Sequence, residues 1–136
     1  MDAVLAPPRC PATLHIPLPS GARSALQARQ AAARMLALEP AVCPRGVAED
    51  LVLIVSELVT NAVLHAKGPY ALTVSAGEGR AGVAVSDGSG DLSGRESGMP
   101  RIGSGGRGLN IVRALGADLF ISRMGSGKHV IAVLTW

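Results

Sequence analysis

The sequence predicts an α+β fold of two layers, in which helices cover one face of a mixed, mostly antiparallel sheet. Its length of 136 residues is typical of one domain. The hydrophobic fraction of 48% is enough to build a single core without metals or disulfides. Short apolar segments occur in hairpin-like pairs with helical segments between them, and this order favours the sandwich over a doubly wound parallel sheet.

The N-terminal segments predict a tail followed by an edge strand. Residues 1–11 contain three prolines and are expected to be a flexible tail, with the folded domain over residues 12–136. Residues 12–18 alternate between polar and apolar side chains, and Pro17 restricts such a strand to the edge of a sheet. Ser20 is expected to cap the helix that follows. The other predicted elements are helices over 22–38, 45–66 and 106–115, and strands over 70–76, 82–86, 118–123 and 129–135.

Charge and aromatic content argue against a nucleic-acid-binding protein. The net charge is only +3, and the cations are scattered along the chain rather than clustered as on a basic binding surface. Aromatic residues make up 2% of the chain, too few for the stacking platforms that hold single-stranded nucleic acids. We therefore expect no direct contact with nucleic acid.

Cysteine usage and hydropathy favour a cytoplasmic protein. Cys10 and Cys43 lack metal-ligand spacing, and we expect both to be reduced. The N-terminus lacks the charged start and apolar run of a signal peptide. The most apolar stretch, residues 51–64, is too short to span a bilayer and is interrupted by Glu57 and Asn61. No membrane association is expected.

Three polar residues recur on the second predicted helix, which is otherwise apolar. Glu57, Asn61 and His65 follow one another at intervals of four, so they form one stripe along the helix. A buried carboxylate is costly unless it is paired or hydrogen-bonded. Two interpretations remain open: a functional site, or a stripe that reaches solvent or is satisfied by a neighbouring turn.

A long glycine-rich segment follows Asp87. The carboxylate of Asp87 comes after an apolar strand, where it can accept a hydrogen bond from a base amine or cap a turn. Residues 87–108 contain almost nothing to pack, and so long a loop is usually functional. The segment from Gly103 to Gly108 runs into a predicted helix, an arrangement that suits an anion but also an ordinary loop. It has neither the Walker A spacing nor the position of a dinucleotide fingerprint.

Four short motifs occur in order, and together they resemble the GHKL ATPase superfamily. They are Glu57-x3-Asn61-x3-His65, Val85-Ser86-Asp87-Gly88, Gly106-Arg107-Gly108-Leu109 and Gly127-Lys128-His129-Val130. The resemblance covers residues 12–134 and is closest to the small anti-sigma-factor kinases with a histidine-kinase-like ATPase domain, of the actinobacterial type. It implies the Bergerat fold, with one helical layer on one mixed sheet.

The resemblance also implies a role for each motif. Asn61 would coordinate the Mg²⁺ that bridges the phosphates of ATP, and Glu57 would be the general base. Asp87 would accept a hydrogen bond from the adenine amino group, and residues 88–103 correspond to the lid. Arg101, Arg107 and Lys128 are the cations expected near the phosphates. The further nucleotide-binding positions are Ser89, Gly103, Gly105, Gly106, Gly108 and Leu109.

The function implied is that of an Mg-ATP-binding anti-sigma factor with serine/threonine kinase activity. It would bind a sigma factor in one state and phosphorylate an anti-anti-sigma partner in another, and family analogy suggests a homodimer through the first strand and helix. The alternative is an ATP-binding interaction module without phosphotransfer. Glu57 favours the kinase. The module is favoured by Ser104, which stands in place of a basic residue, and by the glycines after Asp87, which are one position away from those of the family's motif.

A third interpretation is an ATP-hydrolysing or histidine-kinase-derived fragment. No helix pair carrying a phosphoacceptor histidine precedes the predicted domain, which argues against a complete sensor kinase. His65 and His129 are expected to have structural roles, in hydrogen bonding or packing, rather than catalytic ones.

Overall fold

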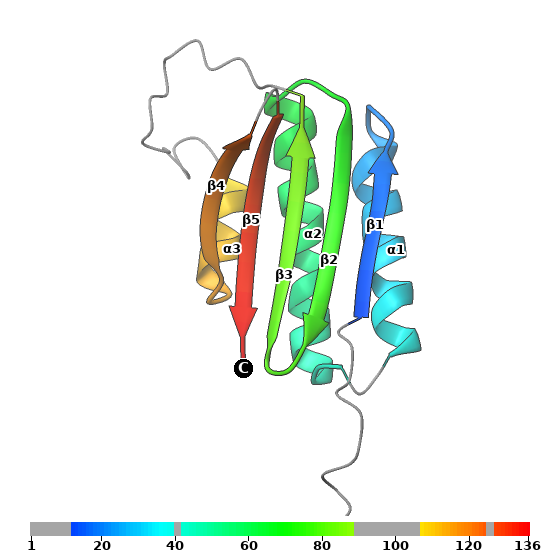
Figure 1. Ribbon diagram of the computed structural model, residues 1–136, viewed down its shortest axis with the longest axis vertical. Helices are drawn as coiled ribbons and strands as arrows, with labels where there is room; N and C mark the ends of the chain where they lie inside the picture. The colour runs from blue at the N-terminus through cyan, green and yellow to red at the C-terminus, as the bar shows by residue number, and fades with distance from the viewer. Residues whose placement is uncertain (1–11, 40–41, 89–106, 125–126) are drawn as a thin grey trace, which may run out of the picture.

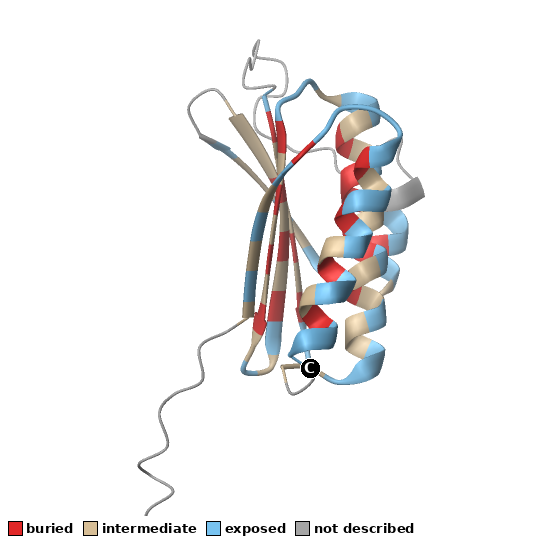
Figure 2. Ribbon diagram, turned by 90° about the vertical axis from the view of Figure 1, so that its right-hand side faces the viewer, coloured by how far each residue is buried: buried red, intermediate tan, exposed pale blue. Residues whose placement is uncertain are grey.

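A sheet and a layer of helices make up the domain in the computed structural model, which describes residues 12–39, 42–88, 107–124 and 127–136. The helices lie on one face of the sheet, and the opposite face is uncovered by them (Figure 1). Buried residues concentrate between the two layers, as Figure 2 shows from the side. The predicted α+β sandwich is therefore confirmed. The predicted tail, residues 1–11, lies outside the described residues.

Within the described ranges, five strands form one sheet in the order β1-β2-β3-β5-β4. Every pair of neighbours is antiparallel, so the sheet is antiparallel throughout rather than mixed. β1 lies at the edge, as Pro17 predicted, because a proline has no N–H to donate to a second neighbour. The strands are β1 (Ala12–Leu18), β2 (Tyr70–Gly77), β3 (Arg80–Asp87), β4 (Asp118–Met124) and β5 (Gly127–Thr135).

The helices of the described residues that cover the sheet are α1 (Arg23–Leu38), α2 (Arg45–His65) and α3 (Arg107–Ala114). α2 lies in the middle, with α1 on one side and α3 on the other (Figure 1). The expected cap by Ser20 is wrong. α1 is preceded by Ala22 without a side-chain cap, and the Gly21 carbonyl accepts a hydrogen bond from the Ser24 N–H at 3.1 Å. In the part of the chain that the structure describes, no helix has the length and apolar character needed to cross a membrane.

The core follows the periodicities of both layers. In β2 and β3 every second side chain is buried, because successive side chains of a strand point to opposite faces. On α2 the buried positions form one broad stripe that packs onto the sheet. Those positions are Leu51, Ile54, Val55, Leu58, Val59 and Ala62.

The turn between β2 and β3 is shorter than the sequence predicted. Gly77 pairs with Arg80, so only Glu78 and Gly79 form the turn, with φ of 54° and 80°. Positive φ at both central residues is the geometry whose twist matches that of an antiparallel hairpin. As a result β3 begins two residues earlier and ends one residue later than expected, so Asp87 is its last residue. Strand alternation then fixes the face on which Asp87 lies.

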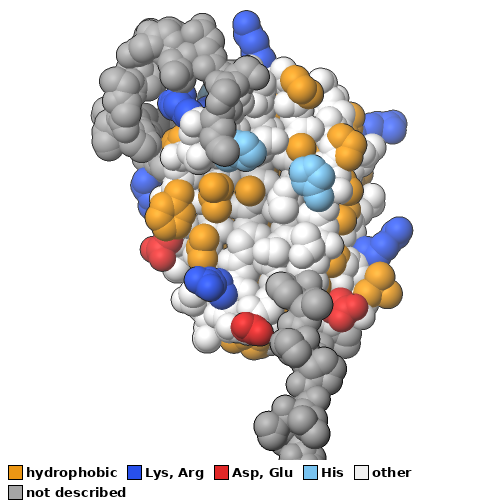
Figure 3. All heavy atoms as spheres, in the orientation of Figure 1, with side chains coloured by type: hydrophobic (Ala, Val, Ile, Leu, Met, Phe, Trp, Pro, Cys, Tyr) orange, Lys and Arg blue, Asp and Glu red, His pale blue; other side chains and the backbone are white. Residues whose placement is uncertain are grey.

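The face of the sheet away from the helices carries polar and apolar side chains together. His15 and Thr73 face each other across β1 and β2, with His15 Nδ1 2.7 Å from Thr73 Oγ1. Phe120 on β4 is 52% exposed. Hydrophobic side chains gather over β4 and β5 on this face (Figure 3).

Candidate functional site

Asp87 supplies a buried carboxylate at the end of β3. It follows the alternation of Ala81, Val83 and Val85, all buried on the helix side of the sheet, so its side chain enters the space between the layers. That side chain is 1% exposed. A carboxylate in such a position is costly unless it has charged or hydrogen-bonding partners. Its burial makes Asp87 the most distinctive polar group of the described core.

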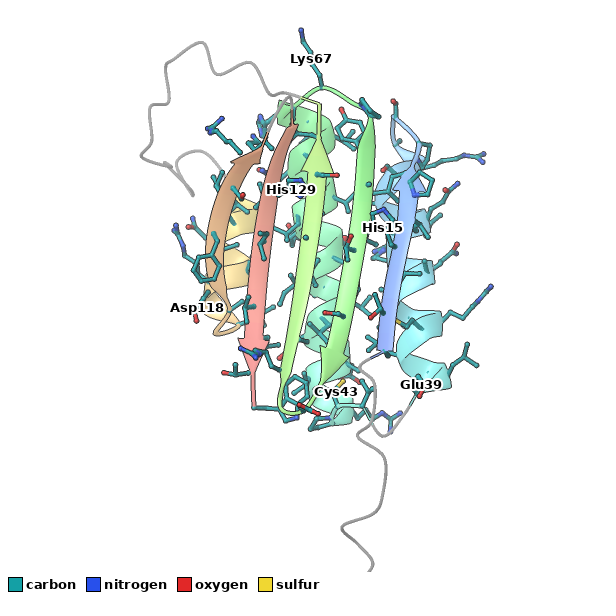
Figure 4. The ribbon with its side chains drawn as sticks, in the orientation of Figure 1. His15, Glu39, Cys43, Lys67, Asp118 and His129 are labelled. Carbon is teal, nitrogen blue, oxygen red and sulfur yellow. The ribbon has the colours of Figure 1, made fainter. Side chains whose placement is uncertain are left out.

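Lys128 on β5 provides a charged partner for Asp87. The two residues are register partners in the antiparallel pair of β3 and β5. The Lys128 Nζ lies 3.8 Å from the Asp87 Oδ2, and the lysine side chain is 23% exposed. The neighbouring His129 is on the open face of the sheet, as Figure 4 shows, which agrees with Lys128 pointing to the helix side. The pair thus joins an almost fully buried acid to a cation that reaches solvent.

The loop after α2 is held against the end of β3. The Gly88 N–H donates a hydrogen bond to the Lys67 carbonyl at 2.7 Å. A Cβ at position 88 would collide with the carbonyl oxygen of Gly68, so the backbones approach closely at this point. Tyr70 is buried, and its hydroxyl donates a hydrogen bond to the Ala66 carbonyl at 2.7 Å. These contacts fix the C-terminal end of α2 beside Asp87.

Glu57 and Asn61 lie on the flank of α2 that faces away from α1. α1 and the first turns of α2 meet at a groove that Val52 helps to line. At 100° per residue, Glu57 and Asn61 lie about 140° and 180° around the helix from Val52. Both are half-buried, whereas His65 at the end of the helix is exposed. The two predicted catalytic and metal-binding side chains therefore occupy the flank where α3 is the neighbouring helix (Figure 1).

α3 packs against α2 on that flank. Leu109 and Val112 are buried, and they anchor this short helix to the core. The backbones of Arg107 and Gly108 form its first turn. Five expected nucleotide-binding residues lie outside the described part of the chain: Ser89, Arg101, Gly103, Gly105 and Gly106. The same holds for Ser104 and for most of the expected lid.

A hollow lies between α1 and the start of α2. It has a volume of about 590 Å³ and a mostly apolar lining. Arg45 and Glu49, one helical turn apart, form an exposed ion pair at 4.0 Å on its rim. Burial raises the pKa of the Cys43 thiol that contributes to its wall. Figure 4 shows Cys43 at the end of the domain opposite to Lys67, and hence away from Asp87.

The structure contains three contacts between residues that the sequence did not predict. They are the pairing of Lys128 with Asp87, the hydrogen bond from Gly88 to Lys67, and the hydrogen bond from Tyr70 to Ala66. The first depends on strand register, which no local pattern reports. The second had a signal, because a glycine directly after a strand often marks a close approach of two backbones.

These features define a two-layer α+β domain with a polar site between the end of the sheet and the helical layer. The family model of the histidine kinase-like ATPase domain matches residues 18–134, and the chain belongs to this family. Membership confirms the superfamily expected from the four motifs and implies that the domain binds ATP. No curated protein matched the chain.

Proposed function

We propose that ATP binds between the end of β3 and the flank of α2, with its adenine directed at Asp87. The observation that carries this proposal is the burial of the Asp87 carboxylate on the helix side of the sheet, at 1% exposure. A carboxylate accepts hydrogen bonds only, so it suits the amino group of adenine. The close contact of Gly88 with the loop after α2 supports a rigid wall for such a pocket.

Asn61 and the glycine-rich segment are the proposed site of the phosphates. Mg²⁺ prefers oxygen ligands and keeps several waters, so a single amide oxygen together with phosphate oxygens is a suitable donor set. Asn61 is half-buried on the flank of α2 that faces α3, which fits that role. Arg101 and Arg107 remain the proposed cations for the phosphates, with the backbones of Gly103, Gly105, Gly106 and Gly108.

The proposed activity is transfer of the γ-phosphoryl group to a serine or threonine of an anti-anti-sigma protein. The substrate hydroxyl oxygen would attack the γ-phosphorus while the bond to the ADP oxygen breaks, and Glu57 would accept the hydroxyl proton. Glu57 lies one helical turn before Asn61, so both side chains lie on the same flank of α2. Binding of a sigma factor, a cytoplasmic location and a homodimer through β1 and α1 belong to the same proposal.

The second candidate function is an ATP-binding interaction module without phosphotransfer. It is favoured by Ser104, which stands where the related kinases carry a basic residue. It is also favoured by the glycines after Asp87, which stand one position away from the glycines of the family's motif. In such a protein ATP would set the conformation that the partner recognises. The two functions share the nucleotide site and differ only in whether the phosphoryl group moves.

The experiment that separates them uses ATP labelled in the γ-phosphate, Mg²⁺ and a candidate anti-anti-sigma protein. The kinase predicts label on a serine or threonine of the partner, lost in Glu57→Gln and retained in Glu49→Gln. Glu49 is a suitable control because it lies on the same helix, with a side chain that is 74% exposed. Binding of ATP without label on the partner would identify the interaction module. Absence of ATP binding, measured by calorimetry, would contradict both functions.

A further inference from the structure

The ion pair between Asp87 and Lys128 is long for a direct hydrogen bond. Charge-assisted N–H···O bonds are about 2.7–2.9 Å, whereas the Lys128 Nζ is 3.8 Å from the Asp87 Oδ2. An ammonium carries three donors. The lysine is also the more exposed partner, at 23% against 1%. Lys128 is therefore placed to donate a hydrogen bond to a group that binds beside the carboxylate.

The amino-bearing edge of adenine offers the complementary pair of groups. The exocyclic amine is a donor, and the adjacent ring nitrogen N1 is an acceptor. A carboxylate accepts and an ammonium donates, so Asp87 and Lys128 together match this edge in polarity. A ligand that presents both groups would bond to the acid and to the cation at once.

We propose that Lys128 is a base-binding residue, which donates a hydrogen bond to N1 of adenine while Asp87 accepts one from the amine. This inference rests on the proposed function, namely that ATP binds with its adenine at Asp87. It gives Lys128 a role different from the phosphate contact that the resemblance implied. The ribose and phosphates leave a purine from the side opposite to the amine and N1. A cation beside Asp87 therefore lies at the base end of the nucleotide.

The test compares ATP with 1-deaza-ATP, in which a carbon replaces N1 and the acceptor is lost. Isothermal titration calorimetry in the presence of Mg²⁺ measures both dissociation constants. We expect the wild-type chain to bind 1-deaza-ATP about tenfold or more weakly, because a hydrogen bond to a charged group is lost. Lys128→Met should bind ATP about tenfold more weakly than the wild type and should no longer discriminate between the two nucleotides.

Arg80→Met is the matched control. Arg80 lies at the other end of β3 from Asp87, so this variant also removes one positive charge but not the cation beside the acid. It should keep the wild-type preference for ATP. Circular dichroism checks that each variant is folded.

Three outcomes overturn the inference without touching the proposed function. They are equal affinity of the wild type for both nucleotides, retained discrimination in Lys128→Met, and lost discrimination in Arg80→Met. If Lys128→Met does not fold, the comparison of the two nucleotides on the wild-type chain still tests the inference, because equal affinities would overturn it. Failure of the wild type to bind ATP at all would overturn the proposed function itself, and this inference with it.

Discussion

Asp87 on β3 and Lys128 on β5 are register partners on neighbouring strands, and the carboxylate and the ammonium are 3.8 Å apart. The pair lies at the end of the sheet where the loop after α2 is fastened to Gly88. One end of the domain thus combines a charge pair, whose acid is buried, with a close backbone contact.

Replacing Gly88 should destabilise the protein. In Gly88→Ala the new Cβ would meet the Gly68 carbonyl, so either β3 or the loop must shift. Forcing an extra methyl group into a packed position costs about 1–3 kcal/mol. Chemical denaturation measures the change in the free energy of unfolding.

Gly82→Ala is the control for this substitution. Gly82 lies on the same strand, and its nearest neighbour to a new Cβ is the Ala132 carbonyl oxygen at 3.9 Å, an ordinary contact. We expect Gly82→Ala to leave stability unchanged or slightly improved, because alanine suits a strand better than glycine. A loss of equal size in both variants would contradict the close approach at Gly88.

Glu57→Gln should separate nucleotide binding from chemistry. Glutamine keeps the size of the side chain but cannot accept the proton of a substrate hydroxyl. We expect ATP affinity to change less than threefold while the phosphotransfer rate falls by about 10²–10⁴, the usual contribution of a general base. Calorimetry and single-turnover transfer to the partner are the two measurements. A matching loss of binding would instead place Glu57 in the nucleotide pocket.

The packing of α2 on the sheet predicts unequal effects of two leucine truncations. Leu58 is 1% exposed and Leu64 is 70% exposed on the same helix. Leu58→Ala should lower the free energy of unfolding by about 2–5 kcal/mol because it leaves a cavity. Leu64→Ala should change it by less than about 0.5 kcal/mol. Similar losses in the two variants, measured by urea denaturation, would mean that α2 packs on a different face.

The Cys43 thiol should titrate at higher pH in the folded protein than in the unfolded chain. Burial raises the pKa of Cys43 in the folded state, so the folded protein keeps the proton where the unfolded chain releases it. The free energy of unfolding should therefore be unaffected below the ordinary thiol range and fall as the pH rises above about 8.5.

Alkylation by iodoacetamide measures this shift directly. In a Cys10→Ser variant Cys43 is the only thiol, and its rate should reach half-maximum at higher pH than in the same chain unfolded by urea. Cys43→Ala, made in the same background, should remove the thiol contribution to the pH dependence of stability. A folded midpoint at or below the unfolded one would show that the thiol is not desolvated.

Some features of the fold were predictable because they depend on residues close together in the sequence. Pro17 places β1 at an edge whatever its neighbours are, and the alternation of β2 and β3 follows from residues two apart. The four motifs in order indicated the family that the match over residues 18–134 confirms. The Ser20 cap failed because Ala22 immediately precedes α1, and the Gly21 carbonyl accepts the hydrogen bond from the Ser24 N–H.

The sequence by itself determined the elements, the edge strand, the polar stripe on α2 and the family. Only the tertiary structure decided that Asp87 ends β3 on the helix side and meets Lys128. The two residues are 41 positions apart in the sequence, and they meet because of the register in which β3 and β5 pair. It also decided that Gly88 touches the loop after α2. Local periodicity fixes which face a residue occupies within its own element, whereas packing of the whole domain fixes which residues of other elements it meets.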